Sequence, residues 1–202
     1  MKHKQEYLHK GTLVQHPFGQ WIRRYFEIGW AVLPLRLTRD PATGKKVPDF
    51  GGFGWKDGPH TLAESLRRLA ALGQQANALA LLTGRASGVT VIDGDGAQGV
   101  ANAARHIPQG TPTARTQSDG RHFFFAYTPD LPTSANRALR VDVRNDGGYI
   151  FLPPSRVAGG GSYTWITAPD HALAPVPPSL VALLRPANAP NESILLACAR
   201  GP

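Results

Sequence analysis

Two aspartates, one residue apart, follow an apolar run near the middle of the chain. The run Val89-Thr90-Val91-Ile92 is rich in β-branched residues, which predicts a buried strand that ends at Asp93 and Asp95. Residues i and i+2 of a strand point to the same face, so both carboxylates are expected to project together. Adjacent carboxylates repel unless a positive charge lies between them, and Mg²⁺ or Mn²⁺ prefers such oxygen ligands. The segment therefore predicts either a metal site or a turn that ends the strand, since Asp and Gly also favour turns.

Two later segments place polar side chains on apolar strands. His122 begins an aromatic strand, where it could orient a ligand or simply cap the strand edge. In Val141-Asp142-Val143-Arg144, Asp142 and Arg144 share one face by the two-residue period of a strand. Asp142 could complete a set of three carboxylates, and Arg144 could grip a phosphate through its planar guanidinium. An internal Asp–Arg pair is the alternative interpretation of this segment.

The charge and cysteine content bear on partners and compartment. The net charge is +8, and residues 1–46 hold nine Lys/Arg against three acidic residues, a net of +6 that leaves +2 for the rest. Such a localised basic excess suits a polyanion such as nucleic acid, although a solubilising surface is the alternative. The single cysteine, Cys198, excludes a disulfide framework and a Cys-rich zinc site, and it fits a reducing, cytoplasmic compartment. No segment is long and apolar enough for a membrane span or a signal peptide, so we expect no membrane partner.

The order of elements predicts an α+β protein with a mixed or antiparallel sheet. Its first half alternates helices, expected at 20–28, 62–73 and 97–106, with strands, expected at 30–35, 78–83 and 89–93. Thr61 and Glu64 have the spacing of a capping box at the second helix, and residues 36–58 are expected to form a loop. Its second half predicts two hairpins, 113–116 with 122–127 and 139–143 with 149–152, then a strand at 162–166 and a helix at 179–184. We expect a flexible basic leader at 1–18, one catalytic domain at 19–184, and a linker at 185–202 with a candidate helix at 192–199.

One motif indicates a different class of protein. Gly94-Asp95-Gly96-Ala97-Gln98-Gly99 fits the G-x-G-x-x-G pattern of dinucleotide-binding folds, after a strand and before a helix. In that pattern the backbone amides approach a pyrophosphate, and here Asp93 and Asp95 would face that anion. No repeating βαβ pattern follows, so we rank a dinucleotide enzyme below a metal-dependent one.

Taken in order, these motifs resemble the bifunctional DNA primase/polymerase family of the archaeo-eukaryotic primase superfamily. The similarity covers about residues 28–166. It is carried by Gly44-Lys45-Lys46-Val47-Pro48, Gly54-Trp55-Lys56, Ala78-Leu79-Ala80-Leu81-Leu82-Thr83-Gly84, Val91-Ile92-Asp93-Gly94-Asp95, Gly120-Arg121-His122, Val141-Asp142-Val143-Arg144, Asp146-Gly147-Gly148-Tyr149, Pro153-Pro154-Ser155 and Tyr163-Thr164-Trp165. Asp95 departs from the family, which often has Glu there, and Ser118-Asp119-Gly120 replaces a Gly-rich turn.

The resemblance implies roles for individual residues. It implies that the catalytic acids, which bind Mg²⁺ or Mn²⁺, are Asp93, Asp95 and Asp142. It implies nucleotide-binding roles for His122, Arg144, Arg121 and Ser118, and contacts with phosphate or DNA for Lys46 and Lys56.

The resemblance also implies a fold and an activity. The fold is an RNA-recognition-like palm with a smaller α/β lobe. The activity is two-metal nucleotidyl transfer from an NTP or dNTP to a 3′-hydroxyl on a single-stranded DNA template, with a replicative helicase as a further partner. A non-catalytic DNA-binding module for replication initiation, with a degenerate nucleotide site, is the alternative.

Overall fold

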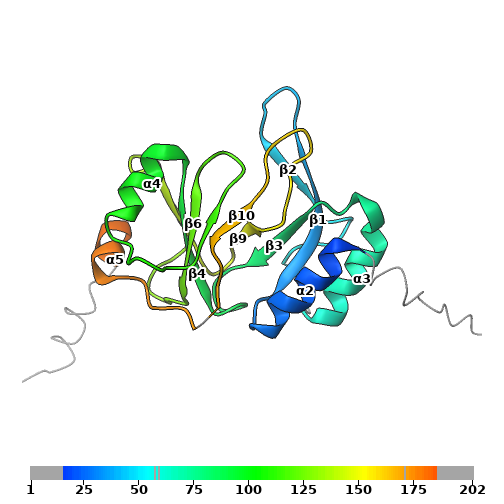
Figure 1. The fold of residues 1–202 in the computed structure, drawn as a ribbon, viewed down its shortest axis with the longest axis horizontal. Helices are drawn as coiled ribbons and strands as arrows, with labels where there is room; N and C mark the ends of the chain where they lie inside the picture. The colour runs from blue at the N-terminus through cyan, green and yellow to red at the C-terminus, as the bar shows by residue number, and fades with distance from the viewer. Residues whose placement is uncertain (1–15, 57, 59, 171, 186–202) are drawn as a thin grey trace, which may run out of the picture.

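Two antiparallel sheets organise the computed structural model, which describes residues 16–56, 58, 60–170 and 172–185 (Figure 1). The smaller sheet has the order β2-β1-β3-β9, and the larger has the order β10-β5-β6-β4-β8-β7. The strands are β1 (Val32–Arg39), β2 (Lys46–Asp49), β3 (Ala78–Leu82), β4 (Val89–Gly94), β5 (Thr113–Arg115), β6 (Arg121–Ala126), β7 (Ser134–Asn136), β8 (Val141–Arg144), β9 (Tyr149–Leu152) and β10 (Thr164–Thr167). The predicted α+β class is confirmed.

Helices cover one face of each sheet. The helices α2 (Pro17–Glu27) and α3 (Leu62–Leu72) pack on the smaller sheet, where Ile22 and Leu69 share a core with Leu79 of β3. A short 3₁₀ turn, η1 (Gly73–Gln75), follows α3. The helices α4 (Gly96–Ala104) and α5 (Pro178–Leu184) cover the far face of the larger sheet, against residues such as Ile92 and Phe125. The other face of the larger sheet is left to meet the smaller sheet.

Strand β4 shows how this second face becomes half apolar and half polar. Ile92 points to the helices, while Val91 points the other way and joins Phe124 in the core between the sheets. Asp93 follows two residues after Val91 and continues the same face, as the strand period requires. The apolar part of this face joins the sheets, and the polar part beyond it faces a pocket.

The start of α3 confirms one local prediction. The Thr61 hydroxyl accepts a hydrogen bond from the backbone N–H of Glu64 at 3.2 Å, so Thr61 caps the helix. The Glu64 carboxylate does not return to the cap, because it accepts hydrogen bonds from Arg67 and Arg68. Gly73, with φ of +53°, follows the last helical residue, as expected for a helix C-terminus.

The predicted hairpin of 139–143 with 149–152 is wrong. Strand β8 pairs with β4 and β7, whereas β9 pairs with β3 in the other sheet. The pairing differs because β9 carries buried residues on both faces, Ile150 and Leu152 on one and Phe151 on the other. A strand of this kind needs packing partners on two sides, which the smaller sheet supplies.

Other boundaries also differ from the sequence prediction. The expected loop at 36–58 contains the end of β1 and the whole of β2. These strands pair in an antiparallel register that runs from Arg36 opposite Asp49 to Arg39 opposite Lys46. Strand β7 has no counterpart in the prediction. Helix α2 begins at Pro17 and buries Phe18, so the folded part begins before the expected boundary at 18. The remainder of the expected leader and the candidate helix at 192–199 lie outside the described residues.

Candidate active site

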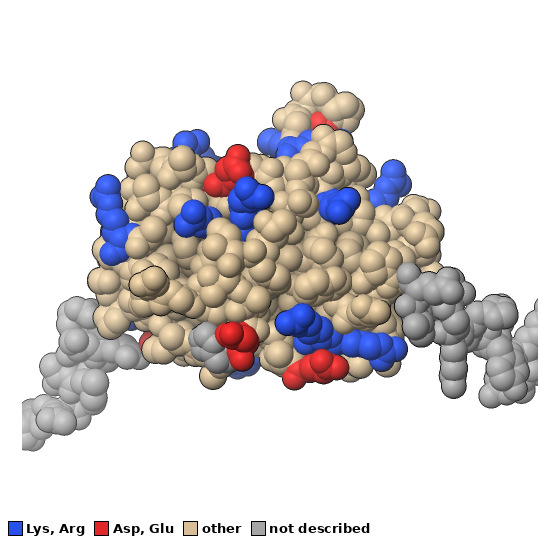
Figure 2. All heavy atoms as spheres, in the orientation of Figure 1, with Lys and Arg blue, Asp and Glu red and all other residues tan. Residues whose placement is uncertain are grey.

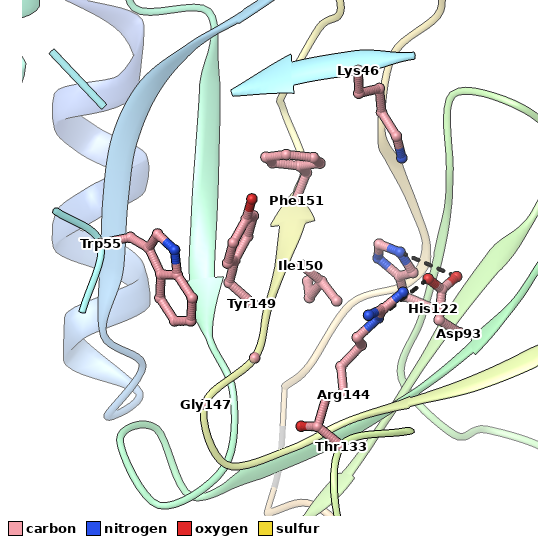
Figure 3. A pocket seen from close by; sticks show the side chains of 11 residues that line it. Lys46, Trp55, Asp93, His122, Thr133, Arg144, Gly147, Tyr149, Ile150 and Phe151 are labelled. Atoms are coloured by element: carbon pink, nitrogen blue, oxygen red, sulfur yellow. Dashed lines mark ion pairs between the residues drawn. The ribbon is translucent and has the colours of Figure 1, made fainter. Parts of the chain in front are cut away.

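A single row of residues crosses the larger sheet near the end of β4. His122 of β6 and Asp142 of β8 are the direct cross-strand partners of Asp93, one on each side. Directly opposed residues of antiparallel strands project from the same face, with their side chains in contact range. The structure thus brings together three of the residues that the sequence singled out, and Figure 3 shows Asp93 and His122 at one wall of a pocket.

Arg144 lies between the two carboxylates of this row. Its Nη2 atom donates to Oδ2 of Asp142 at 2.6 Å, and its Nε atom lies 3.9 Å from Oδ2 of Asp93. Like charges directly opposite each other destabilise a sheet, so the guanidinium offsets a repulsion that the register creates. The internal Asp–Arg pair considered from the sequence is therefore formed, and it includes Asp93 as well.

Burial dominates the electrostatics of the row. It raises the pKa of Asp93 to about 6, with the charges of Arg144 and Lys46 opposing the rise and that of Asp142 adding to it. Burial likewise lowers the pKa of His122 to about 3, helped by the positive charges of Lys46 and Arg144. His122 Nε2 lies 3.5 Å from Oδ1 of Asp93. His122 is therefore neutral at neutral pH, and its buried Nδ1 atom has no hydrogen-bond partner among the described residues.

Asp95 stands beyond the row, at the start of α4. Its backbone N–H donates to the carbonyl oxygen of Arg140 at 2.9 Å, and its side chain is exposed. Partial burial, and then the negative charge of Asp93, raise the pKa of its carboxyl group. Asp95 is thus an electrostatic neighbour of Asp93 but lies at the rim of the site.

The expected set of three metal-binding carboxylates is not assembled among the residues that the structure describes. Within residues 16–185, apart from the three positions left undescribed there, no three His, Cys, Asp or Glu side chains converge as they would around a metal ion. Asp93 and Asp142 nevertheless supply paired, mostly buried carboxylate oxygens, and a cationic group already lies against both. Hard oxygen donors of this type fit Mg²⁺ or Mn²⁺.

Asp93 and His122 of this row line a pocket of about 300 Å³ between the two sheets (Figure 3). One wall is charged, and the wall across from it is largely aromatic and comes from the smaller sheet and its loops. The lining residues are Lys46, Trp55, Asp93, His122, Thr133, Arg144, Gly147, Gly148, Tyr149, Ile150 and Phe151. A pocket with apolar walls and a few convergent polar groups is the usual form of a small-molecule site.

Lys46 brings a positive charge to the pocket from edge strand β2. Although the residue is exposed, its Nζ atom lies 3.2 Å from the Tyr163 hydroxyl and 5.6 Å from the centre of the Phe151 ring. Burial lowers the pKa of this ammonium group, while the charges of Asp93 and Asp95 raise it. The structure therefore places Lys46 across the pocket from the acidic residues.

The other sequence-predicted residues lie outside the pocket or at its rim. Arg121 points to the opposite face of β6 from His122, where it lines a separate hollow with Phe123. Ser118 is exposed in the turn before β6 and accepts a hydrogen bond from the Gln117 side chain. Lys56 is exposed, with its ammonium 5.1 Å from the centre of the Trp55 ring.

The aromatic wall of the pocket was not predicted from the sequence. Tyr149 and Phe151 line the pocket from β9, and Trp55 packs edge-on to Tyr149 with ring centres 5.0 Å apart. The sequence signal was limited to the position of Trp55 and Tyr149 within segments that resemble the family, and Phe151 lies between two such segments. Their convergence with the acids depends on β9 joining the smaller sheet.

Gly99 of the G-x-G-x-x-G segment and Gly120, in the turn before β6, have a packing role. A Cβ atom on Gly99 would lie 2.1 Å from the carbonyl oxygen of Arg140, so only glycine lets α4 approach the chain before β8 this closely. A Cβ atom on Gly120 would lie 2.6 Å from the carbonyl oxygen of Gly94. Both neighbours of β4 are antiparallel to it, whereas a dinucleotide fold needs parallel strands there. The dinucleotide interpretation therefore does not fit the fold.

Basic side chains are spread over the one face of the molecule that Figure 2 shows. Figure 2 shows Lys and Arg scattered across the viewed face and more numerous there than Asp and Glu. Lys2, Lys4 and Lys10, which contribute to the basic excess of residues 1–46, lie outside the described residues. In the described part of the chain no helix combines the length and apolarity that a membrane crossing requires.

Comparison with known proteins gives one result. None of the curated proteins matches the chain. The family model for the N-terminal region of bifunctional DNA primase/polymerases matches residues 22–191, which include both sheets and every residue of the pocket. The chain therefore belongs to the bifunctional DNA primase/polymerase family.

Proposed function

We propose that this domain is a template-dependent DNA primase/polymerase that transfers a nucleotidyl group from an NTP or dNTP to a 3′-hydroxyl on single-stranded DNA. The observation that carries the proposal is the row of Asp142, Asp93 and His122, of which Asp93 and His122 line a pocket, in a chain of this family. The larger sheet, backed by α4 and α5, corresponds in this proposal to the palm, and the smaller sheet with α2 and α3 corresponds to the second lobe.

The proposed metal ligands are Asp93 and Asp142, with Asp95 at the rim. Divalent metal bound there supplies positive charge next to the attacking and leaving oxygens. The carboxylate pair is mostly buried, with side-chain exposures of 15% for Asp93 and 14% for Asp142, so a cation held there is poorly screened by water. Asp93 of this pair lines the pocket.

The proposed triphosphate site lies between Lys46 and Arg144. Lys46 reaches in from the smaller sheet and Arg144 from the larger, so an anion in the pocket meets positive charge on two sides (Figure 3). Neutral His122 donates or accepts one hydrogen bond at the floor of the pocket. A group held from two lobes is fixed in orientation, which is the main requirement of phosphoryl transfer.

The test is nucleotide incorporation by Asp93→Asn compared with Asp130→Asn, a matched change at an exposed aspartate. Both variants are assayed without primer on single-stranded DNA, with labelled NTPs or dNTPs and either Mg²⁺ or Mn²⁺. Asp93→Asn is expected to lose incorporation, and Asp130→Asn is expected to keep it. Full incorporation by Asp93→Asn would refute the proposed catalytic role.

A second candidate function is DNA binding without catalysis. The observation that favours it is Arg144, which already neutralises the carboxylates that the reaction needs. This candidate predicts strongly salt-dependent DNA binding together with no Mn²⁺-dependent nucleotide binding. Titration of the wild-type protein with a dNTP, with and without Mn²⁺, separates the two functions.

A further inference from the structure

The position of Arg144 is unusual for a residue whose only expected role is to bind the nucleotide. Its guanidinium donates a short hydrogen bond to Asp142 and faces Asp93, yet 34% of its side chain is exposed and the residue lines the pocket. The two carboxylates behind it have side-chain exposures of only 15% and 14%. Asp93 and Arg144 both line the pocket, whereas Asp142 is bonded to the guanidinium and is not among the lining residues. A cation that enters from the pocket therefore reaches the pair of carboxylates only beside the arginine.

The register makes this arrangement a consequence of the fold. Arg144 is two residues after Asp142 on β8 and opposite Val91, which is two residues before Asp93 on β4. It therefore lies one row behind the acids on the same face of the sheet. From that row the long, flexible side chain of Arg144 can either fold onto the carboxylates or extend into the pocket. Both positions are accessible because only the guanidinium is held in place, by its ion pairs with the two acids.

We propose that Arg144 is a resident counter-cation that competes with divalent metal for the carboxylates of Asp93 and Asp142. This inference rests on the proposed function of the site. When metal takes over the neutralisation of the two acids, the guanidinium is released on the pocket side. Arg144 is thus a positioning residue. When its guanidinium leaves the carboxylates, the metal site is complete and the guanidinium is free to bind phosphate.

The competition predicts that removing the guanidinium strengthens metal binding. Arg144→Gln leaves the two carboxylates facing each other with no neighbouring cation on β8, so a metal ion that binds them has no resident guanidinium to displace. We expect Mn²⁺ alone to bind this variant about tenfold more tightly than it binds the wild type, a typical scale for one close charge pair. A residue that served only nucleotide binding would leave the affinity for Mn²⁺ alone unchanged.

The experiment is a titration of the full chain with Mn²⁺ and no nucleotide, with free Mn²⁺ followed by electron paramagnetic resonance. Arg105→Gln is the matched control, because it removes one positive charge from an exposed residue at the end of α4, behind the larger sheet. Arg144→Lys retains the charge without the planar fork, and its affinity is expected between those of the wild type and Arg144→Gln. Circular dichroism melts establish that the variants are folded.

A second measurement follows Arg144 in the folded wild-type protein, where its positive charge is retained. In ¹⁵N spectra, the Nε–H signal of Arg144 is identified by its absence from Arg144→Lys. Addition of Mg²⁺ is expected to shift this signal and speed its exchange with water as the guanidinium leaves the carboxylates.

The outcomes separate the inference from the proposed function. Equal or weaker Mn²⁺ binding by Arg144→Gln overturns the inference and leaves the proposed function standing. Equal tightening in Arg105→Gln also overturns it, because the effect is then one of net charge. If the Nε–H signal of Arg144 neither shifts nor exchanges faster while Mg²⁺ binds, the guanidinium is not released, and that part of the inference is overturned. Absence of Mn²⁺ binding in the wild type and every variant overturns both the inference and the proposed function.

Discussion

Asp93 and Asp142 occupy directly opposed positions on the neighbouring antiparallel strands β4 and β8. Two mostly buried carboxylates so placed destabilise the sheet unless a cation offsets their repulsion, and in the structure Arg144 does so. Stability alone would not require two acids at these positions. Their placement is understandable if the site must attract cations, as the proposed reaction requires.

Replacing Asp142 by Asn tests the second proposed metal ligand. Asn keeps the shape of the side chain but removes its charge, so we expect nucleotide incorporation to fall by about 100-fold or more. Thermal unfolding followed by circular dichroism is expected to show a folded protein. Asp119→Asn, an exposed aspartate in the turn before β6, is the control. Incorporation at the wild-type rate by Asp142→Asn would remove Asp142 from the proposed metal site.

Replacing Lys46 by Met tests the charge across the pocket. Met keeps a flexible, unbranched side chain but removes the ammonium group, which lies over the Phe151 ring and interacts with the charges of Asp93 and Asp95. We expect the KM for the nucleotide to rise by about tenfold, because a charge that binds the triphosphate is lost. Lys45→Met, at the exposed neighbouring residue, is the matched control. The same KM in both variants would show that Lys46 does not contact the nucleotide.

The acid sensitivity of folding is expected to depend in part on Glu64. Hydrogen bonds from Arg67, and then from Arg68, lower the pKa of this carboxyl group from about 4.5 to about 2. The folded state therefore prefers the ionised form, and this contribution to stability is complete above about pH 4.5 and lost as the pH falls towards 2. Glu64→Gln should reduce the difference between urea midpoints measured at pH 7 and pH 3.

The control for this measurement is Glu27→Gln, at an exposed glutamate at the end of α2. It is expected to retain the wild-type difference between the two pH values. If Glu64→Gln also retains the full difference, the hydrogen bonds from Arg67 and Arg68 do not contribute measurably to folding stability.

Replacing Gly99 by Ala tests the close contact between α4 and the chain before β8. The added methyl group would collide with the carbonyl oxygen of Arg140, which also accepts the N–H of Asp95. We expect the free energy of unfolding to fall by about 1–3 kcal/mol, the usual cost of overpacking. Chemical denaturation measures it, with Ala101→Ser on the exposed side of α4 as the control. An unchanged free energy of unfolding would show that the helix can move away freely.

The sequence alone determined the local features of the site. The two-residue period placed Asp142 and Arg144 on one strand face and put Asp93 at the end of a buried strand, and the structure shows both. The cap at Thr61 and the stop at Gly73 were also local, since each depends on the hydrogen bonds and backbone angles of a few neighbouring residues.

Tertiary structure alone decided which strands share a sheet. The turn between β8 and β9 is short enough for a hairpin, yet β8 pairs with β4 and β9 crosses to β3. That choice places Asp142 beside Asp93 and puts Tyr149 and Phe151 across the pocket from them. Strand pairing depends on burial of both faces by distant segments, so no period within one strand specifies it. Arg144 likewise takes its place between two acids only once the register of β4 and β8 has brought those acids together.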